Sequence, residues 1–520
     1  MTRGRGGWTA RSSVVVAVLL VGAAASGACR PEPPFQIVGD SVRPKDGDPI
    51  PRVSPFFDGV VVRLRAARGE TLGVSVLVGP AGGAVRLELP AAAVRAFASR
   101  ALDVREPSTA MYGPSRGAGR YADVLVPAET TRVLTRHAFF DVTVPPGAAP
   151  GRHAGWLDVA GRRLPVELRV DPVTIDLAAE PLVWVFYDPK EIARVHGTVD
   201  DDGPAQLAAE RRYDELFRAH GAYLANDLPA DRFLKRRPDM RGARYWPVAL
   251  ESGNDGDAAL AVNVKKWLEA FRDLPTIPFA IPIDEPGSDD RRRQVRKLFD
   301  AAGRAGAGRP RFLRAVTDAV SPIYGDSVDV YIAPQNLPDP ARARRASGER
   351  FWTYNGRPPA AGSMILDTDG VALRTWGWIA QRYDVELWYA WEGLYFSDRY
   401  NGGGPTDVMR QAITFDERRR RGPGKSRDFG NGDGVLAYPG PQPSLRLKAL
   451  RRGLQDRLLA RRLASCGGAD EAQRIVHEMV PRALGEGRGR ASWPTAEPPW
   501  EAARQRLLDA LIARCPDAHP

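Results

Sequence analysis

The sequence predicts a multidomain protein of the mixed β and α/β class. We expect an N-terminal β-sandwich, then a (β/α)8 barrel of the TIM type, and a short helical C-terminus. Two patterns carry this prediction: residues 56–178 alternate polar and apolar side chains with period two, and residues 180–465 alternate strand-like with helix-like segments. The length of 520 residues, with 43% hydrophobic and 26% charged residues, is typical of a globular protein of two to three domains.

Residues 1–28 are predicted to be a signal peptide. Basic residues precede the apolar stretch VVVAVLLVGAAA (14–25), which is too short to span a bilayer. Cys29 follows small residues, as at a bacterial lipoprotein cleavage site, so a lipid anchor through Cys29 and simple export both stay open. We expect an exported protein of the cell envelope or a secreted one, with no transmembrane helix in the mature chain.

The β-sandwich prediction follows from short alternating segments separated by Gly and Pro turns. Residues 29–55 are rich in proline and are expected to form a tether, after which segments such as GVVVRLRA, TLGVSVLVG and AFFDVTVPP read as strands. Residues 113–117, GPSRG, match the GxSxG pattern of a nucleophile elbow. Ser115 lacks the strand before it and the helix after it that this elbow needs, so we assign it no catalytic role.

The barrel prediction rests on eight strand-like segments with helical patterns between them. They are LVWVFY (182–187), AYLAND (222–227), YWPVAL (245–250), IPFAIPID (277–284), FLRAV (312–316), VDVYIA (328–333), FWTYNG (351–356) and VELWYAW (385–391). This number and order of units is typical of a (β/α)8 barrel. Residues 466–520 are expected to form a C-terminal helical extension.

The fourth strand-like segment ends on two adjacent carboxylates, Asp284 and Glu285. Catalytic groups of (β/α)8 barrels lie at the carboxyl ends of the strands. Neighbouring side chains on a strand point to opposite faces, but both can reach the mouth where the backbone turns into the loop. The structural alternative is a helix entry, where negative charge is favourable. Both readings stay open at this point.

The other strand ends carry aromatic and amide side chains, which indicate a carbohydrate site. Aromatic faces stack on the C–H surfaces of sugars, and amides satisfy their hydroxyl groups. The strand-end residues are Tyr187, Asn226, Gln335 and Asn336, Tyr354 and Asn355, and Trp391 and Glu392.

Other classes of partner are not expected. Basic residues exceed acidic ones by 74 to 63, but the densest run, ERRRRGPGKSR (417–427), has no interleaved aromatics and is expected to be a solvated loop, so no nucleic acid is predicted. The six histidines have no metal-ligand spacing, and CxxC and HExxH are absent from the sequence, so no metal or other cofactor is predicted. Cys466 and Cys515 could pair in an oxidising compartment or stay as two buried thiols.

Several segments together carry a family resemblance. They are VPPGAAPGRHAGWLDV, the strand ending in Asp284-Glu285-Pro286, the WTYN segment, LRTWGWIAQRYDVELWYAW, GNGDGVLAYPG and PSLRLKALRRGLQD. On these segments the chain resembles glycoside hydrolase family 123, the β-N-acetylgalactosaminidase family, and the uncharacterised proteins that share its catalytic domain. The resemblance covers most of the chain.

The resemblance implies a retaining, substrate-assisted mechanism on terminal β-linked 2-acetamido sugars, GalNAc before GlcNAc. The acetamido oxygen of the sugar attacks the anomeric carbon, Asp284 orients the acetamido N–H, and Glu285 protonates the leaving oxygen. Sugar subsites are expected at Tyr354, Asn355, and Trp388 or Trp391. Arg374, Asp433 and Tyr438 recur in the resemblance and either contact substrate or anchor the loop after the eighth strand.

Two other functions remain open from the sequence. A hydrolase acting on glycans without an acetamido group would need a third carboxylate, for which Glu392 and Asp367 are the candidates. A non-catalytic surface glycan-binding protein would use the same mouth without turnover.

Overall fold

The structure is a computed structural model of the chain. It describes residues 33–79, 82–128, 132–199, 202–236, 242–251, 256–333, 350–420 and 426–515, together with Gly348, Gly422 and Gly424. The predicted signal peptide and Cys29 lie outside these residues, so export and lipid anchoring stay predictions. Within the described part of the chain, no helix is long and apolar enough to cross a membrane.

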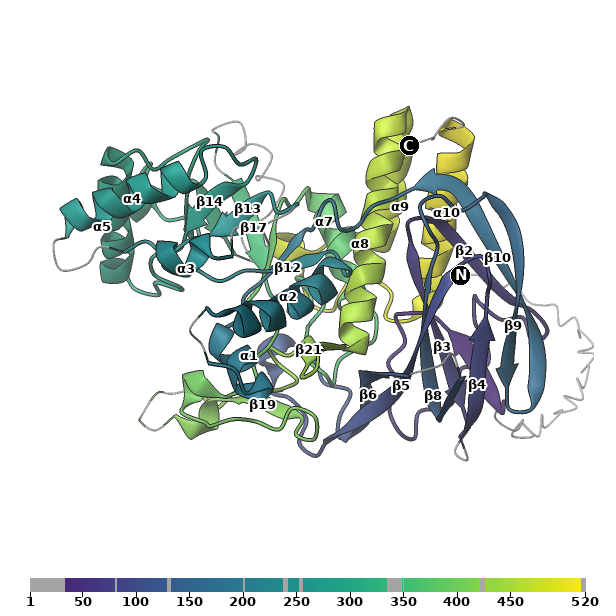
Figure 1. The fold of residues 1–520 in the computed structure, drawn as a ribbon. Helices are drawn as coiled ribbons and strands as arrows, with labels where there is room; N and C mark the ends of the chain where they lie inside the picture. The colour runs from purple at the N-terminus through teal and green to yellow at the C-terminus, as the bar shows by residue number, and fades with distance from the viewer. Residues whose placement is uncertain are drawn as a thin grey trace, which may run out of the picture. The chain divides into compact units, whose positions relative to one another are not determined.

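Two five-stranded sheets make up the N-terminal part (Figure 1). Their strand orders are β1-β3-β8-β5-β6 and β2-β10-β9-β4-β7, and all neighbours are antiparallel except β2 and β10. The strands are β1 Phe35–Val38, β2 Val62–Arg68, β3 Thr71–Val78, β4 Gly83–Glu88, β5 Ala93–Val104, β6 Gly119–Pro127, β7 Arg132–Thr135, β8 His137–Thr143, β9 Gly151–Val159 and β10 Arg162–Thr174.

One hydrophobic core joins these two sheets. Val74 and Phe140 of the first sheet and Val85 and Leu168 of the second are fully buried in the same cluster. The alternation seen in the sequence therefore places one face of each sheet in a shared interior. The segment predicted as a tether differs from expectation, because its apolar residues FQIV form β1, which pairs with β3.

The second half of the chain contains one eight-stranded parallel sheet, ordered β12-β11-β18-β17-β16-β15-β14-β13. Each of the eight predicted segments overlaps one of its strands, and only β17 begins outside its segment, by one residue. The strands are β11 Val183–Val185, β12 Ala222–Leu224, β13 Tyr245–Pro247, β14 Ile277–Ala280, β15 Leu313–Val316, β16 Val330–Ile332, β17 Arg350–Tyr354 and β18 Trp388–Ala390. The first strand, β11, pairs with both β12 and the last strand, β18, as the first strand of a barrel does. Among the described residues no backbone pairing joins β12 to β13. The mixed β and α/β class is confirmed.

Pro278 lies inside β14, and the ladder adapts to it. The N–H of Ile277 donates to Arg244, and the N–H of Val248 donates to Phe279, so the β13 side of the strand keeps its hydrogen bonds. The missing N–H of Pro278 faces the β15 side, where pairing starts only at Phe279. The interior strand therefore tolerates Pro278, because its pairing with β15 begins at the residue after the proline.

Helices lie between and after the parallel strands. They are α1 Pro189–His196, α2 Pro204–Arg218, α3 Ala230–Leu234, α4 Asp257–Ala270, α5 Asp289–Arg304, α7 Arg374–Tyr383, α8 Leu445–Leu463, α9 Ala469–Met479 and α10 Glu497–Arg514. The units are unequal: α3 has five residues, and the connection from β15 to β16 contains the short 3-10 helix η3, Pro322–Tyr324. A disulfide joins Cys466, just after α8, to Cys515 at the end of α10, so the two thiols pair.

Candidate active site

A cavity of about 510 Å³ opens where the parallel strands end. Its lining residues from strand ends are Trp184 and Phe186 (β11), Asp227 (β12), Pro247 and Val248 (β13), Ile281, Asp284 and Glu285 (β14), Tyr354 and Asn355 (β17), and Tyr389 and Trp391 (β18). The rest come from two other regions: Met111, Tyr112, Tyr400, Phe415, Glu417 and Arg420. Aromatic rings and carboxylates dominate this wall, which is the composition expected of a carbohydrate site.

The acidic pair lines the cavity with both side chains, although the two residues are consecutive. Glu285 has a φ of 43°, in the left-handed region, so the chain turns between the two residues instead of continuing as a strand. The Thr317 hydroxyl donates to Asp284 Oδ1 at 2.7 Å and accepts the backbone N–H of Glu285 at 2.8 Å. One buried side chain from the end of β15 thus fixes both members of the pair.

The pair does not serve as a helix entry. Helix α5 begins at Asp289, its N-cap is Ser288, and the carboxylates of its first turn are Asp289 and Asp290. Asp284 and Glu285 lie upstream of this cap and face the cavity. The helix entry that the sequence left open as an alternative role for the pair is therefore formed by Ser288, Asp289 and Asp290 instead.

Tyr354 and Asn355 support the pair from β17. The Tyr354 hydroxyl donates to Glu285 Oε1 at 2.9 Å, and burial together with the charge of Glu285 raises the pKa of that hydroxyl. Asn355 has a φ of 49°, and its side-chain oxygen accepts the backbone N–H of Trp391 at 3.0 Å. The WTYN segment therefore connects the ends of β17 and β18 around the cavity.

Stacked aromatic rings form one wall. Trp184 and Tyr389 stack with ring centroids 4.1 Å apart and an interplanar angle of 15°. The ring centroid of Tyr354 lies 6.3 Å from that of Tyr389. Burial and the charge of Asp284 raise the pKa of the Tyr389 hydroxyl well above its ordinary value, so it stays protonated as a hydrogen-bond donor.

The N-terminal sheets contribute to the cavity as well. Tyr112 belongs to a 3-10 helix, η1 Ala110–Tyr112, in the connection from β5 to β6. Burial and the neighbouring charge of Asp433 raise the pKa of the Tyr112 hydroxyl. Asp433 itself accepts Trp391 Nε1–H at 3.0 Å, and burial raises its pKa to about 7. Tyr112 and Met111 were not predicted as site residues, because nothing in the sequence links that loop to the distant strand ends.

Asp227 is a third carboxylate in the cavity. Asp227 is exposed at the cavity surface, but the protein around its carboxyl group partly desolvates it and raises its pKa to about 6, and the charge of Asp284 acts in the same direction. The sequence analysis selected its neighbour Asn226, whose side chain instead donates to the backbone oxygen of Tyr187 at 2.6 Å. The signal that would have found Asp227 is its place as the last residue of AYLAND, one position beyond Asn226.

Three predicted binding residues lie away from the cavity. Tyr187 is buried, and its hydroxyl donates to Glu210 Oε2 at 2.7 Å. Trp388 is buried against Trp376, with ring centroids 4.7 Å apart. The Tyr438 hydroxyl donates to buried Asp123 Oδ2 at 2.6 Å. Their polar atoms therefore serve the interior, which corrects their prediction as sugar contacts. Asn336 and Gln335 lie outside the described residues.

Glu392 and Asp367, the two candidates for a third catalytic carboxylate, also form contacts in the protein interior. Glu392 is buried and forms an ion pair with Arg399. Asp367 is buried and accepts hydrogen bonds from Ser108 and Ser115. Neither lines the cavity. Arg374 is buried in ion pairs with Asp456 and Glu501 and does not line the cavity.

The arginine run after Asp416 differs in part from the predicted solvated loop. Arg418 pairs with Asp416 and Glu106, and Arg419 pairs with Asp398. Arg420 and Glu417 line the cavity. Among the described residues, no group of three or more His, Cys, Asp or Glu side chains is placed to hold a metal ion.

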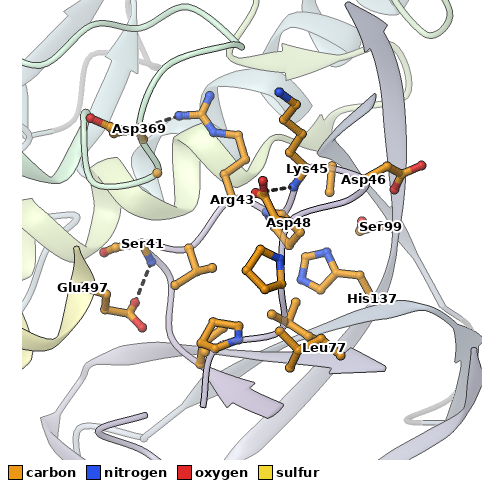
Figure 2. Close-up of a pocket in the computed structure, with 18 of the residues that line it drawn as sticks. Ser41, Arg43, Lys45, Asp46, Asp48, Leu77, Ser99, His137, Asp369 and Glu497 are labelled. Carbon is orange, nitrogen blue, oxygen red and sulfur yellow. Dashed lines mark hydrogen bonds between the residues drawn. The ribbon is translucent and has the colours of Figure 1, made fainter. Parts of the chain in front are cut away.

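A second cavity, of about 660 Å³, lies elsewhere, and residues 38–55 supply nearly half of its lining. Figure 2 shows how that segment is held: the Ser41 N–H donates to Glu497, and Arg43 donates to the backbone oxygen of Asp369. None of the predicted site residues lines this cavity.

Comparison with known proteins gives one informative match. No family model and no curated protein matches the sequence. Among solved structures, a family 123 glycoside hydrolase from Clostridium perfringens matches over 92% of this chain and 95% of its own, with a TM-score of 0.59 and 10% identity. The resemblance predicted from the sequence is confirmed. At this identity the likeness is one of fold.

Weaker matches include two other glycosidase structures. A glycosyl hydrolase family 2 member from Bacteroides cellulosilyticus covers 74% of this chain and 49% of its own, with 10% identity and a TM-score of 0.28. A GH10 xylanase with a bacterial Ig-like domain, from termite gut, covers 77% of this chain and 100% of its own, with 10% identity and a TM-score of 0.21. These two are too distant to carry an argument.

Proposed function

We propose that the protein is an exported glycoside hydrolase that removes terminal β-linked N-acetylhexosamine, GalNAc in preference to GlcNAc. The observation that carries the proposal is the consecutive pair Asp284 and Glu285, turned into one aromatic cavity and fixed by Thr317. The fold likeness supports it, because the Clostridium perfringens protein was studied for glycolipid glycan hydrolysis. In this proposal the eight parallel strands act as a (β/α)8 catalytic barrel, and the two N-terminal sheets as a β-sandwich.

The mechanism is retaining and substrate-assisted. The acetamido oxygen forms a bond to the anomeric carbon as the glycosidic C–O bond breaks, and Glu285 gives its proton to the leaving oxygen. Water then attacks the anomeric carbon from the vacated side, passes its proton to Glu285, and the acetamido group is restored. Asp284 accepts the acetamido N–H and balances the positive charge of the oxazolinium intermediate.

The adjacency of the two carboxylates fits this mechanism better than a two-carboxylate one. A carboxylate nucleophile must face its acid across the scissile bond at about 5 Å, and an inverting pair lies wider still. Two residues from one strand end approach the sugar from the same side. The sugar then has to supply the nucleophile itself.

The hydrogen bonds around the pair suit separate roles. Thr317 donates to Asp284 Oδ1, which leaves Oδ2 to accept the acetamido N–H. Tyr354 donates to Glu285 Oε1, which leaves Oε2 to carry the proton toward the leaving group.

Release of the aryl group from aryl β-GalNAc glycosides tests the proposal. We expect Asp284→Asn and Glu285→Gln each to lower kcat by about 100- to 10,000-fold, with Asp290→Asn on the exposed first turn of α5 as the matched control. The kcat of Glu285→Gln should fall least for a substrate whose leaving group has a low pKa, because that leaving group needs no proton.

A change in the substrate tests the nucleophile. Replacing the acetamido by a trifluoroacetamido group should lower kcat of the wild type steeply, because the oxygen of the trifluoroacetamido group is a poorer nucleophile. Turnover unchanged in both pair variants would overturn the proposal, and glycan binding without turnover would indicate a binding protein.

A further inference from the structure

Asp227 differs from the other acids around the cavity in how its charge is satisfied. Asp284 accepts from Thr317, Glu285 accepts from Tyr354, and Asp433 accepts from Trp391. Within the described part of the chain, no other residue donates a hydrogen bond to the Asp227 carboxylate. Its side chain lines the cavity at the end of β12 and lies near enough to Asp284 for that charge to act on it.

Because Asp227 is exposed in the cavity, water satisfies its carboxylate in the free protein, and a ligand that displaces this water must satisfy the charge in its place. A cation is one solution, but none of the described acidic residues group into a metal-binding cluster. The other solution is a neutral ligand with hydroxyl donors. One carboxylate accepts from two hydroxyls at once, and a sugar presents such neighbouring hydroxyls around its ring.

The position of Asp227 beside Asp284 decides which hydroxyls it reaches. In the mechanism above, Asp284 accepts the N–H of the acetamido group on C2. The next ring positions on that side carry the 3- and 4-hydroxyls. We infer that Asp227 is the acceptor for the 3- and 4-hydroxyls of the sugar that is released, and so selects sugars in which both are free. This inference rests on the proposed function.

The inference defines the substrate class. An anionic substituent on either hydroxyl, such as a sulfate, would face both Asp227 and Asp284 and be excluded by charge. A substituent on the 6-hydroxyl would escape this repulsion. The expected substrates are therefore non-reducing terminal N-acetylhexosamines unsubstituted at the 3- and 4-positions.

Deoxy substrates test the assignment. The measurement is kcat/KM for an aryl β-GalNAc glycoside and its 3-deoxy, 4-deoxy and 4-O-sulfated forms, in wild type, in Asp227→Asn, and in the control Asp231→Asn on the exposed face of α3. In wild type and the control, each deoxy substrate should lose about 10- to 100-fold, since each loses a hydrogen bond to a charged group. For Asp227→Asn, kcat/KM on the parent glycoside should be lower than in wild type, and kcat/KM on the deoxy forms should be little lower again. Its kcat/KM on the sulfated form should be higher than that of wild type. Equal deoxy penalties in wild type and Asp227→Asn would overturn the inference.

Two readouts keep the outcome separate from folding and from the proposed function. Asp227 has no partner to lose among the described residues, so Asp227→Asn should melt at the wild-type temperature or above, whereas a structural residue would melt lower. If wild type releases no aryl group, the proposed function fails. Calorimetry then measures the affinity of wild type and of Asp227→Asn for GalNAc and for 3-deoxy-GalNAc. If the two proteins bind each sugar with the same affinity, the inference is wrong too.

Discussion

At the scale of single residues, the site depends on a threonine that holds two consecutive carboxylates. The Thr317 hydroxyl donates a hydrogen bond to Asp284 and accepts one from the backbone N–H of Glu285. The sequence predicted the pair, because a buried strand ending in two acids is unusual. It did not predict Thr317, because a threonine after a strand is common and its partner lies 33 residues earlier in the chain.

Replacing Thr317 should therefore damage catalysis more than folding. We expect Thr317→Val, which keeps the shape, to lower kcat on an aryl β-GalNAc glycoside by about 10- to 100-fold, since a hydrogen bond to a charged group is lost. KM should change less, because the sugar contacts remain. Thr317→Ser restores the hydroxyl and should recover most of the rate. Steady-state kinetics of the two variants provide the measurement, and a kcat for Thr317→Val equal to or higher than that for Thr317→Ser would contradict a role for the hydroxyl.

At the scale of elements, strand positions were predictable and strand faces were not. Buried parallel strands read as short apolar runs, so all eight segments could be found. Neighbours on a strand point to opposite faces, and the sequence alone does not say which face is inside. At β18 the prediction named Trp388 and Trp391. Trp391 lines the cavity together with Tyr389, while Trp388 packs on α7 through Trp376. On β12 it chose Asn226 over Asp227 for the same reason.

The loop after β20, Phe429–Asn431, places a buried titratable group, Asp433, behind the cavity wall, where it accepts a hydrogen bond from Trp391. Burial raises the pKa of Asp433 from 3.8 to about 7, so the folded protein holds this proton more tightly than the unfolded chain does. The contribution of Asp433 to stability is thus fullest at pH below about 4 and is lost as pH rises toward about 7.

Asp433→Asn removes this titration and can keep an acceptor for Trp391 Nε1–H. The melting temperature of the variant minus that of wild type should therefore rise between pH 4 and pH 7, by an amount worth about 1 to 3 kcal/mol of unfolding free energy. Thermal melts of both proteins at several pH values in that window provide the measurement. A difference independent of pH would mean that Asp433 is ionised in the folded protein throughout.

At the scale of the whole molecule, buried ion pairs join parts that the sequence presented as separate domains. Arg452 of α8 pairs with Glu70, between β2 and β3, at 2.7 Å and with Glu501 of α10 at 2.6 Å. Arg446 of α8 pairs with Asp123 of β6 at 2.8 Å. The sequence analysis considered only the densest arginine run, at 417–427, and did not predict these buried arginines, because arginine is rarely buried without partners. Glu70 and Asp123 lie 382 and 323 residues from their arginines in the chain, a separation that no local pattern reveals.

This network predicts that the N-terminal sheets and the part of the chain that contains the parallel sheet unfold together. Glu501→Gln keeps the shape but leaves the buried Arg452 and Arg374 short of a charge, and removing one partner of a buried pair costs about 3–5 kcal/mol. The matched control is Glu180→Gln, which breaks the exposed pair with Arg461 of the same helix and should change stability little. Melts followed by tryptophan fluorescence and by far-UV circular dichroism should show one coincident transition, several degrees lower in Glu501→Gln than in the control. Two separated transitions, or equal melting temperatures in the two variants, would contradict the coupling, because a network that joins the parts cannot lose a central charge without weakening both.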